Sequence, residues 1–185
     1  MSLGEVPRTF FTADTHFGDP RVLRIDRRPF ASVADHDAAL KRAWNDSVGP
    51  NDTVWHLGDV LRPQAGSCAD LLASLNGRKH LIVGNNDPAG TVEAEGWDSV
   101  QAYAELTLDG QLLILCHYAF RTWNQMGRRS INLHGHSHGR LKSVTRQFDV
   151  GVDAQGLRPV TLQEILARAA ARTRRMGATS APTKF

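Results

Sequence analysis

Residues 9–16 of this chain read TFFTADTH. The first five are β-branched, aromatic or small, a composition typical of a short buried strand. The last three, Asp14, Thr15 and His16, include a carboxylate and an imidazole, which are side chains that bind metal ions. A strand that ends in such residues places them at the edge of a sheet, where ligands bind in α/β proteins.

The same order of strand and polar residues recurs four times further along the chain. The recurrences are residues 53–57 followed by Gly58-Asp59, residues 80–83 by Gly84-Asn85-Asn86-Asp87, residues 112–116 by His117, and residues 131–133 by His134-Gly135-His136-Ser137-His138. Because the carboxyl ends of strands share one edge of a sheet, the five polar clusters are expected to converge on one crevice.

Further strands and helices fill the intervals between these clusters. Residues 106–108 and 144–150 predict two more strands, and Asp109-Gly110 predicts a hairpin turn. Helices are predicted after Ser32, over residues 69–75 and after Thr161. Thr161 forms a capping box with Glu164. The apolar face of the first helix carries Leu40, Ala43 and Trp44, and that of the last helix carries Leu162, Ile165, Leu166, Ala169 and Ala170. Alternating strands and helices predict an α/β fold with mixed sheets.

Composition indicates one ordinary globular domain. The chain has 185 residues, of which 41% are apolar and 22% charged, and this excludes collagen, low-complexity disorder and a coiled coil. We expect a single domain over residues 1–175 and a flexible tail over residues 176–185. The net charge of +3 comes from the last part of the chain: six basic residues and one acidic residue follow from Arg158 onward, so residues 1–157 carry −2.

The sequence also predicts the cellular setting. Cys68 and Cys116 are far apart and lie in apolar runs, which favours buried, reduced thiols in a reducing compartment. The N-terminus lacks a signal-peptide pattern, and the longest apolar run, residues 112–116, is too short to span a bilayer. A cytoplasmic protein without membrane contact is therefore expected; the sequence does not indicate its oligomeric state.

Seven polar residues in the five clusters are candidate metal ligands. They are Asp14, His16, Asp59, Asn85, His117, His136 and His138. One zinc-like ion takes about three or four protein ligands, so seven suit two ions that share a carboxylate. Nitrogen and oxygen donors without a thiolate suit Mn²⁺, Fe²⁺ or Zn²⁺, and the sequence does not choose among them.

The ordered set D-x-H, G-D, G-N-x-D, H and G-H-x-H resembles the calcineurin-like metallophosphoesterase family over residues 9–153, in particular its small single-domain bacterial and phage members. The resemblance implies a β-sandwich of two mixed sheets flanked by helices, with a dinuclear centre. It implies that Asp14, His16, Asp59 and His138 bind one ion and that Asp59, Asn85, His117 and His136 bind the other. Asp59 would be the bridging ligand, and Asp87 would orient a ligand or the residue before it.

The implied activity is hydrolysis of a small phosphoester by a hydroxide that bridges two divalent ions. Arg121 is the first candidate for a guanidinium that stabilises the phosphoryl charge, and Arg62 is the second. Asn86 stands where many family members have a histidine thought to protonate the leaving oxygen. We therefore expect phosphodiesters or nucleotide-type substrates to be preferred, with His134 or metal-bound water as the acid.

Two other functions compete with this prediction. A non-catalytic scaffold that binds proteins would have no reason to keep all seven ligands. A nuclease would need a basic groove, and residues 1–157, with a net charge of −2, do not supply one. Nucleic acid is therefore a less favoured partner. The arginines of the last helix are first interpreted as cations near a helix C-terminus. His36 and His56 are expected in an exposed helix and in the core, and Asp149 and Asp153 at structural turns.

Overall fold

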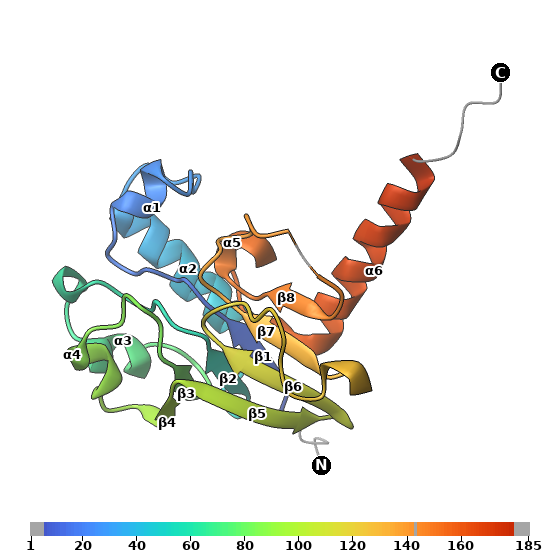
Figure 1. Cartoon of the computed structure of the whole chain (residues 1–185). Helices are drawn as coiled ribbons and strands as arrows, with labels where there is room; N and C mark the ends of the chain where they lie inside the picture. The colour runs from blue at the N-terminus through green and yellow to red at the C-terminus, as the bar shows by residue number, and fades with distance from the viewer. Residues whose placement is uncertain (1–5, 143, 180–185) are drawn as a thin grey trace, which may run out of the picture.

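The computed structural model describes residues 6–142 and 144–179, which form two facing β-sheets with helices packed around them (Figure 1). The first sheet has the order β4-β3-β2-β1-β9. Its strands are β1 (Thr9–Thr12), β2 (Thr53–His56), β3 (Arg78–Ile82), β4 (Trp97–Gln101) and β9 (Val160–Thr161). The first four are parallel, and β9 pairs antiparallel with β1.

The second sheet has the order β5-β6-β7-β8. Its strands are β5 (Tyr103–Leu108), β6 (Gln111–Cys116), β7 (Ile131–His134) and β8 (Gln147–Asp149). β5 and β6 form the antiparallel hairpin predicted from Asp109-Gly110, both of which have positive φ, whereas β6, β7 and β8 are parallel. The expected β-sandwich of two mixed sheets flanked by helices is therefore confirmed.

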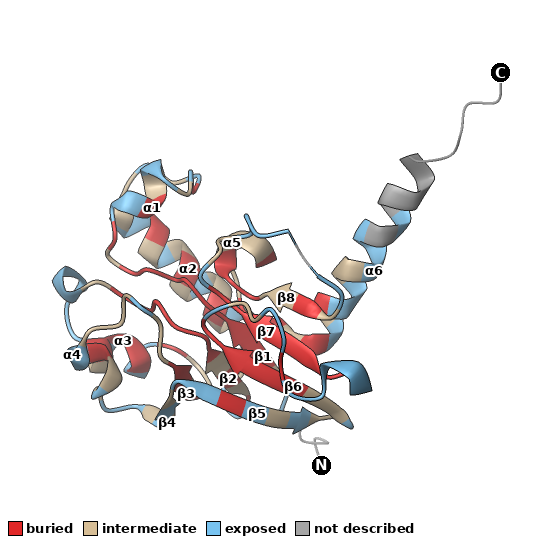
Figure 2. Ribbon diagram, viewed as in Figure 1, coloured by how far each residue is buried: buried red, intermediate tan, exposed pale blue. Residues whose placement is uncertain are grey.

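Alternation along the strands divides the apolar residues between two cores, because successive side chains of a strand point to opposite faces. Phe11 and Leu57 belong to the core between the sheets, together with Leu115 and Leu133 of the second sheet. Phe10 belongs to a second core, under the helices that cover the outer face of the first sheet. Figure 2 shows that β7 is buried along its whole length and that most of β1 is buried.

The helices are α1 (Arg21–Arg24), α2 (Val33–Ser47), α3 (Cys68–Ala73), α4 (Ala89–Val92), α5 (Val152–Gln155) and α6 (Leu162–Thr179), with 3-10 turns over Pro63–Ala65 and Met126–Arg128. The Ser32 side chain accepts a hydrogen bond from the Asp35 N–H at the start of α2. The predicted capping box is present at α6: the Thr161 N–H donates to Glu164 and the Glu164 N–H donates to the Thr161 hydroxyl. Within the described residues, we find no helix with the length and apolar character needed to cross a bilayer.

Several elements differ from the prediction. Strands β4 and β9 were not predicted, and β8 is shorter than residues 144–150, because Arg146 has a left-handed backbone (φ 64°) that ends strand geometry there. Helix α6 continues to Thr179, beyond the expected boundary at residue 175. The remainder of the expected tail, residues 180–185, lies outside the described residues. His36 is fully buried, contrary to expectation: its ring packs edge-on against Phe30, and its Nε2 lies 2.9 Å from Nη1 of Arg28.

Candidate metal centre

The loops after β1, β2, β3, β6 and β7 meet at one end of the sandwich, as the strand and motif order predicts. Backbone hydrogen bonds hold them together: the N–H of Asp14 donates to the Gly58 carbonyl (2.9 Å), and the N–H of His16 donates to the Asp59 carbonyl (3.1 Å). From the second sheet, the Gly135 N–H donates to the His117 carbonyl (3.0 Å). Loops that are far apart in the sequence therefore form one rigid rim.

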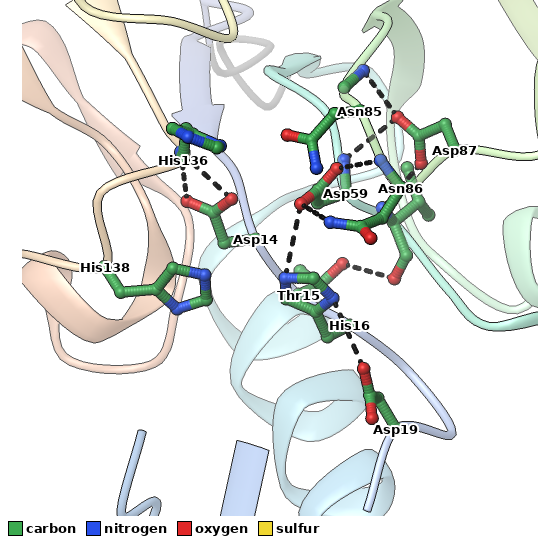
Figure 3. Close-up of polar contacts among 12 residues, drawn as sticks. Asp14, Thr15, His16, Asp19, Asp59, Asn85, Asn86, Asp87, His136 and His138 are labelled. Atoms are coloured by element: carbon green, nitrogen blue, oxygen red, sulfur yellow. Dashed lines mark hydrogen bonds and ion pairs between the residues drawn. The ribbon is translucent and has the colours of Figure 1, made fainter. Parts of the chain in front are cut away.

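One group of possible metal ligands comes from the first and last motifs. Asp14, His16 and His138 each offer an atom within 4.8 Å of the others. The rings of His16 and His138 are stacked, with centroids 5.3 Å apart. The carboxylate of Asp14 accepts the backbone N–H of His136 at 2.9 Å, which ties the two motifs together (Figure 3).

A second group contains Asp14, Asp59 and His117. The Asp59 carboxylate lies between two histidines, 3.5 Å from Nε2 of His16 and 3.6 Å from Nε2 of His117. The side-chain oxygen of Asn85 lies 3.0 Å from the same nitrogen of His117. The resemblance implies Asp59 as the shared ligand; in the structure Asp14 belongs to both groups, while Asp59 contacts a histidine of each.

His136 completes the cluster. Its ring packs edge-on against the ring of His117, with centroids 5.1 Å apart, and against Tyr118 at 4.8 Å. All seven sequence-predicted ligands are therefore brought to one place by the fold.

The backbone at this place is unusual. Five of the seven candidate ligands are non-glycine residues with left-handed φ: Asp14 (56°), His16 (48°), Asp59 (60°), His136 (66°) and His138 (49°). This conformation turns each side chain sharply away from the strand direction, and it is unfavourable for residues with a Cβ atom. Aspartate and histidine tolerate it better than most residues.

Glycine is required where the backbone passes closest to the ligands. A Cβ atom at Gly84 would lie 2.4 Å from the Asp59 carboxylate and 2.6 Å from the Asp59 nitrogen. A side chain at this position would displace the Asp59 carboxylate.

Asp87 fastens the β3 loop to the β2 loop. Its carboxylate accepts three backbone N–H groups, from Asp59 (2.9 Å), Val60 (2.8 Å) and Gly84 (2.8 Å). These contacts fix the backbone that carries Asp59, which fits the predicted orienting role of Asp87.

Asn86, which departs from the family pattern, is bound to Asp59. Its side-chain N–H donates to one carboxylate oxygen of Asp59 at 2.7 Å, and its backbone N–H donates to the other at 2.8 Å. Figure 3 shows its amide beside the Asp59 carboxylate. Asn86 therefore holds a candidate ligand in place and offers no acidic proton.

Behind the ligands lies a buried network that sequence reasoning missed. Arg28, whose side chain is 1% exposed, donates to both Asp153 carboxylate oxygens (2.9 and 2.7 Å) and to the backbone carbonyls of Asp14 (2.6 Å) and Thr15 (2.8 Å). Asp153 also contacts Nδ1 of His138 at 2.8 Å. Asp153 was expected at a structural turn; the structure shows that it joins a ligand histidine to Arg28. The only signal in the sequence is an arginine near the first motif.

Burial and hydrogen bonds set the protonation of the cluster. Burial raises the pKa of Asp14 well above its ordinary value, and burial lowers the pKa of His16 to about 4. Burial would raise the pKa of Asp59, but hydrogen bonds from Asn86 and the proximity of His117 lower it overall. A buried carboxylate such as Asp14 is stable as an anion only beside compensating positive charge. Burial also lowers the pKa of His136, whereas the hydrogen bond to Asp153 raises the pKa of His138 against the effect of burial. Imidazole nitrogens with carboxylate and amide oxygens form a donor set that fits divalent cations.

A cleft of about 220 Å³ opens over this cluster. Its lining includes His16, Asp59, Asn86, His136 and His138 and also four charged residues that the sequence did not indicate: Asp19, Arg21, Asp26 and Arg140.

The remaining predicted residues lie outside that lining. Arg121 is exposed, and Arg62 donates to Asp19 at 2.8 Å. His134 is buried, with Nδ1 2.8 Å from the Gly135 carbonyl. His56 lies in the core, as expected, with Nε2 2.9 Å from the Thr15 hydroxyl.

Comparisons with known proteins agree with this geometry. Residues 9–152 match the family model of the calcineurin-like phosphoesterase superfamily domain. The chain is 31% identical to the Gene 66 protein of Mycobacterium phage L5 over 194 residues, covering 85% of this chain and 91% of that protein. It is 32% identical to the Gene 66 protein of Mycobacterium phage D29 over 177 residues, covering 78% and 87%. A solved structure of the protein AQ665 of unknown function from Aquifex aeolicus superposes with a TM-score of 0.70 at 19% identity, covering 86% of this chain and 98% of that one.

Proposed function

This chain belongs to the calcineurin-like phosphoesterase superfamily, and from that membership we propose that it hydrolyses phosphodiesters or nucleotide-type phosphoesters with two divalent cations. The observation that carries the proposal is the position of the Asp59 carboxylate, within 3.6 Å of histidines from both halves of the cluster. A carboxylate so placed would be available to two ions, one on each side, which a single-ion site would not need.

The donor set divides between two ions along the lines of the resemblance. Asp14, His16 and His138 would hold one with Asp59, and Asn85, His117 and His136 would hold the other with Asp59. Divalent cations supply Lewis-acid activation of water and of phosphoryl oxygens at such a site. Mn²⁺, Fe²⁺ and Zn²⁺ all suit these donors.

The chain's own residues prepare the site for this chemistry. His16 is neutral at pH 7 because burial lowers its pKa to about 4, so its lone pair is available to a cation. The Leu57 carbonyl, 2.7 Å from Nδ1 of His117, fixes the tautomer that leaves Nε2 as an acceptor facing Asp59. Arg28 fixes the backbone of Asp14 and Thr15 from behind.

Asn86 favours esters with good leaving groups. Its amide is engaged with Asp59 and has no proton to give at a useful pKa, so an unactivated leaving oxygen gains no help from it. We therefore expect an aryl phosphodiester to react faster than an alkyl phosphomonoester.

The test is an activity screen of protein treated with chelator and reloaded with Mn²⁺, Fe²⁺ or Zn²⁺. The substrates are bis(p-nitrophenyl) phosphate, p-nitrophenyl phosphate, an alkyl phosphomonoester, a cyclic nucleotide and a short oligonucleotide. Turnover of the diester that depends on added metal supports the proposal, and no turnover of any substrate with any of the metals overturns it. Fastest turnover of the oligonucleotide would identify a nuclease.

The variant Asp59→Asn tests the metal assignment. Loss of one carboxylate charge between two ions is expected to reduce bound metal and to lower turnover at least ~100-fold, about 2.7 kcal/mol of barrier. Metal content is measured by plasma mass spectrometry and folding by circular dichroism. Asp109→Asn, in the exposed β5–β6 turn, is the matched control, because asparagine also tolerates the left-handed backbone there. Retention of full metal content by Asp59→Asn would contradict the assignment.

A further inference from the structure

Two arginines line the cleft beside the metal-ligand cluster, and the proposed function does not use them. Arg21 begins α1, and Arg140 follows His138 by two residues. Both belong to the cleft lining together with His16 and His138. Guanidinium groups in a cleft are suited to bidentate binding of phosphate oxygens.

Arg21 is held in place by a buried carboxylate. Its Nε and Nη2 donate to Asp19 at 3.0 and 2.8 Å, and Asp19 is 2% exposed. The same carboxylate accepts Nε of Arg62 at 2.8 Å. Two guanidinium groups on one carboxylate leave an excess of positive charge at this end of the cleft.

Arg140 is held in the same way on the other side of α1. Its Nη2 contacts Asp26 at 2.6 Å and the Ile25 carbonyl at 2.9 Å. The side chains of Arg21 and Arg140 remain 48% and 58% exposed, so the N–H groups outside these contacts face the open cleft or solvent. Both cations are therefore preorganised and accessible.

The arginines lie beyond the ligand cluster. The His16 ring has Nε2 3.5 Å from Asp59 and Nδ1 3.8 Å from Asp19, so Asp59 and Asp19 lie against opposite sides of the imidazole. Figure 3 shows Asp19 on the side of His16 away from Asp59. The His16 ring and the Asp19 carboxylate thus lie between Arg21 and the Asp59 carboxylate.

The cleft also has an apolar part. Val22 and Ile25 belong to its lining together with the two arginines, and Ile25 is 57% exposed. A cleft that combines an exposed aliphatic side chain with two held guanidinium groups suits a ligand with an apolar body and a phosphate.

We propose that Arg21 and Arg140 bind a second phosphate group, one that is not hydrolysed, so that the preferred substrates are nucleotides carrying a further phosphate beside the scissile ester. This inference rests on the proposed function and names the substrate class of the same site. The scissile phosphate lies at the Asp59 cluster, the sugar and base lie toward Ile25, and the second phosphate lies on the arginines.

The experiment compares two substrates with the same scissile bond and the same leaving group. These are thymidine 5′-(p-nitrophenyl phosphate) and its analogue that carries an additional 3′-phosphate. The metal-loaded protein is expected to show a KM for the 3′-phosphorylated substrate lower by at least about tenfold, the effect of a charge-assisted contact at a half-exposed site. The variants Arg21→Gln and Arg140→Gln should lose this preference, measured within each variant as the ratio of its KM values for the two substrates. Arg24→Gln, on the same helix but outside the cleft lining, is the matched control and should keep the preference.

Equilibrium binding separates this inference from the proposed function. Calorimetry with thymidine 3′,5′-bisphosphate and with thymidine 5′-monophosphate requires no turnover. Tighter binding of the bisphosphate that both glutamine variants abolish supports the inference even when no ester is hydrolysed. Equal binding of the two ligands by the wild-type protein, or an equal loss of both in the variants, overturns it while leaving ester hydrolysis intact.

Discussion

Replacing Arg28 with methionine isolates the buried network behind the candidate ligands. Methionine keeps an unbranched apolar stem of similar length and removes every N–H group of the guanidinium. The Asp153 carboxylate then loses two hydrogen bonds and the carbonyls of Asp14 and Thr15 lose one each. Asp153, whose side chain is 12% exposed, is left as a buried anion beside His138 alone.

The expected cost follows from this loss. Removing one partner of a buried ion pair destabilises a protein by about 3–5 kcal/mol. We expect Arg28→Met to lower the free energy of unfolding by about 4 kcal/mol, which a domain with a stability of about 5–15 kcal/mol can survive. Arg28→Lys keeps the charge but cannot reach both Asp153 and the two carbonyls, so a loss of about 2 kcal/mol is expected.

The assay is urea unfolding of chelator-treated protein, followed by circular dichroism, so that bound metal does not mask the change. Arg24→Met on the exposed face of α1 is the control and should stay within about 0.5 kcal/mol of wild type. A double-mutant cycle with Asp153→Asn should show a coupling energy of about 2 kcal/mol between the two residues. A loss below about 1 kcal/mol for Arg28→Met, or additive effects in the cycle, would refute the assignment of this network as a main support of the first motif.

Three further changes test other supports of the structure. Asp87→Asn replaces an oxygen that accepts backbone N–H groups with an amide donor. The free energy of unfolding, measured with urea, should therefore fall by about 2 kcal/mol, and Mn²⁺ binding, measured by calorimetry, should weaken. Unchanged values of both would contradict the role of Asp87. Thr161→Ala removes the α6 capping box and should lower the urea-derived stability by about 1 kcal/mol, whereas Thr161→Ser should preserve it. Arg158 lowers the pKa of Glu164 from 4.5 to about 2. The ion pair of Glu164 with Arg158 therefore stabilises the fold above pH 4.5, and this stabilisation is lost as the pH falls toward 2. In thermal melts recorded across this pH range, Glu164→Gln should flatten the loss of stability, and an unaltered pH profile would argue against this role of the ion pair.

The sequence predicts those parts of the fold that depend on local order. Each candidate ligand lies within four residues of the end of a strand, so the strand pattern and the turn residues suffice to place Asp14, Asp59 and His117 at one edge. The Asp109-Gly110 turn and the Thr161 capping box are likewise short-range patterns. The strand β9 has only two residues and no such pattern, and it exists because Val160 pairs with Phe11 of β1.

The charged wall of the cleft and the buried network behind the ligands depend on contacts that no local pattern encodes. Arg140 meets Asp26 across 114 residues, and Arg28 meets Asp153 across 125 residues. Sequence reasoning chose Arg121 because it stands near His117, but proximity along the chain does not bring it into the cleft lining. The cleft receives Arg21 from the 19–28 segment, which carries no metal ligand and thus no motif, and Arg140 from the residues just after His138.

The left-handed backbone at five candidate ligands has a consequence for protein engineering. Each such residue costs on the order of 1 kcal/mol in backbone energy, which glycine would recover. At Asp14, His16, Asp59, His136 and His138, glycine would therefore recover backbone energy while removing the side-chain contacts made there. Wherever the recovered backbone energy is the larger, selection for heat resistance alone favours loss of a ligand, so a thermostabilisation campaign on this protein needs metal content as a second selection.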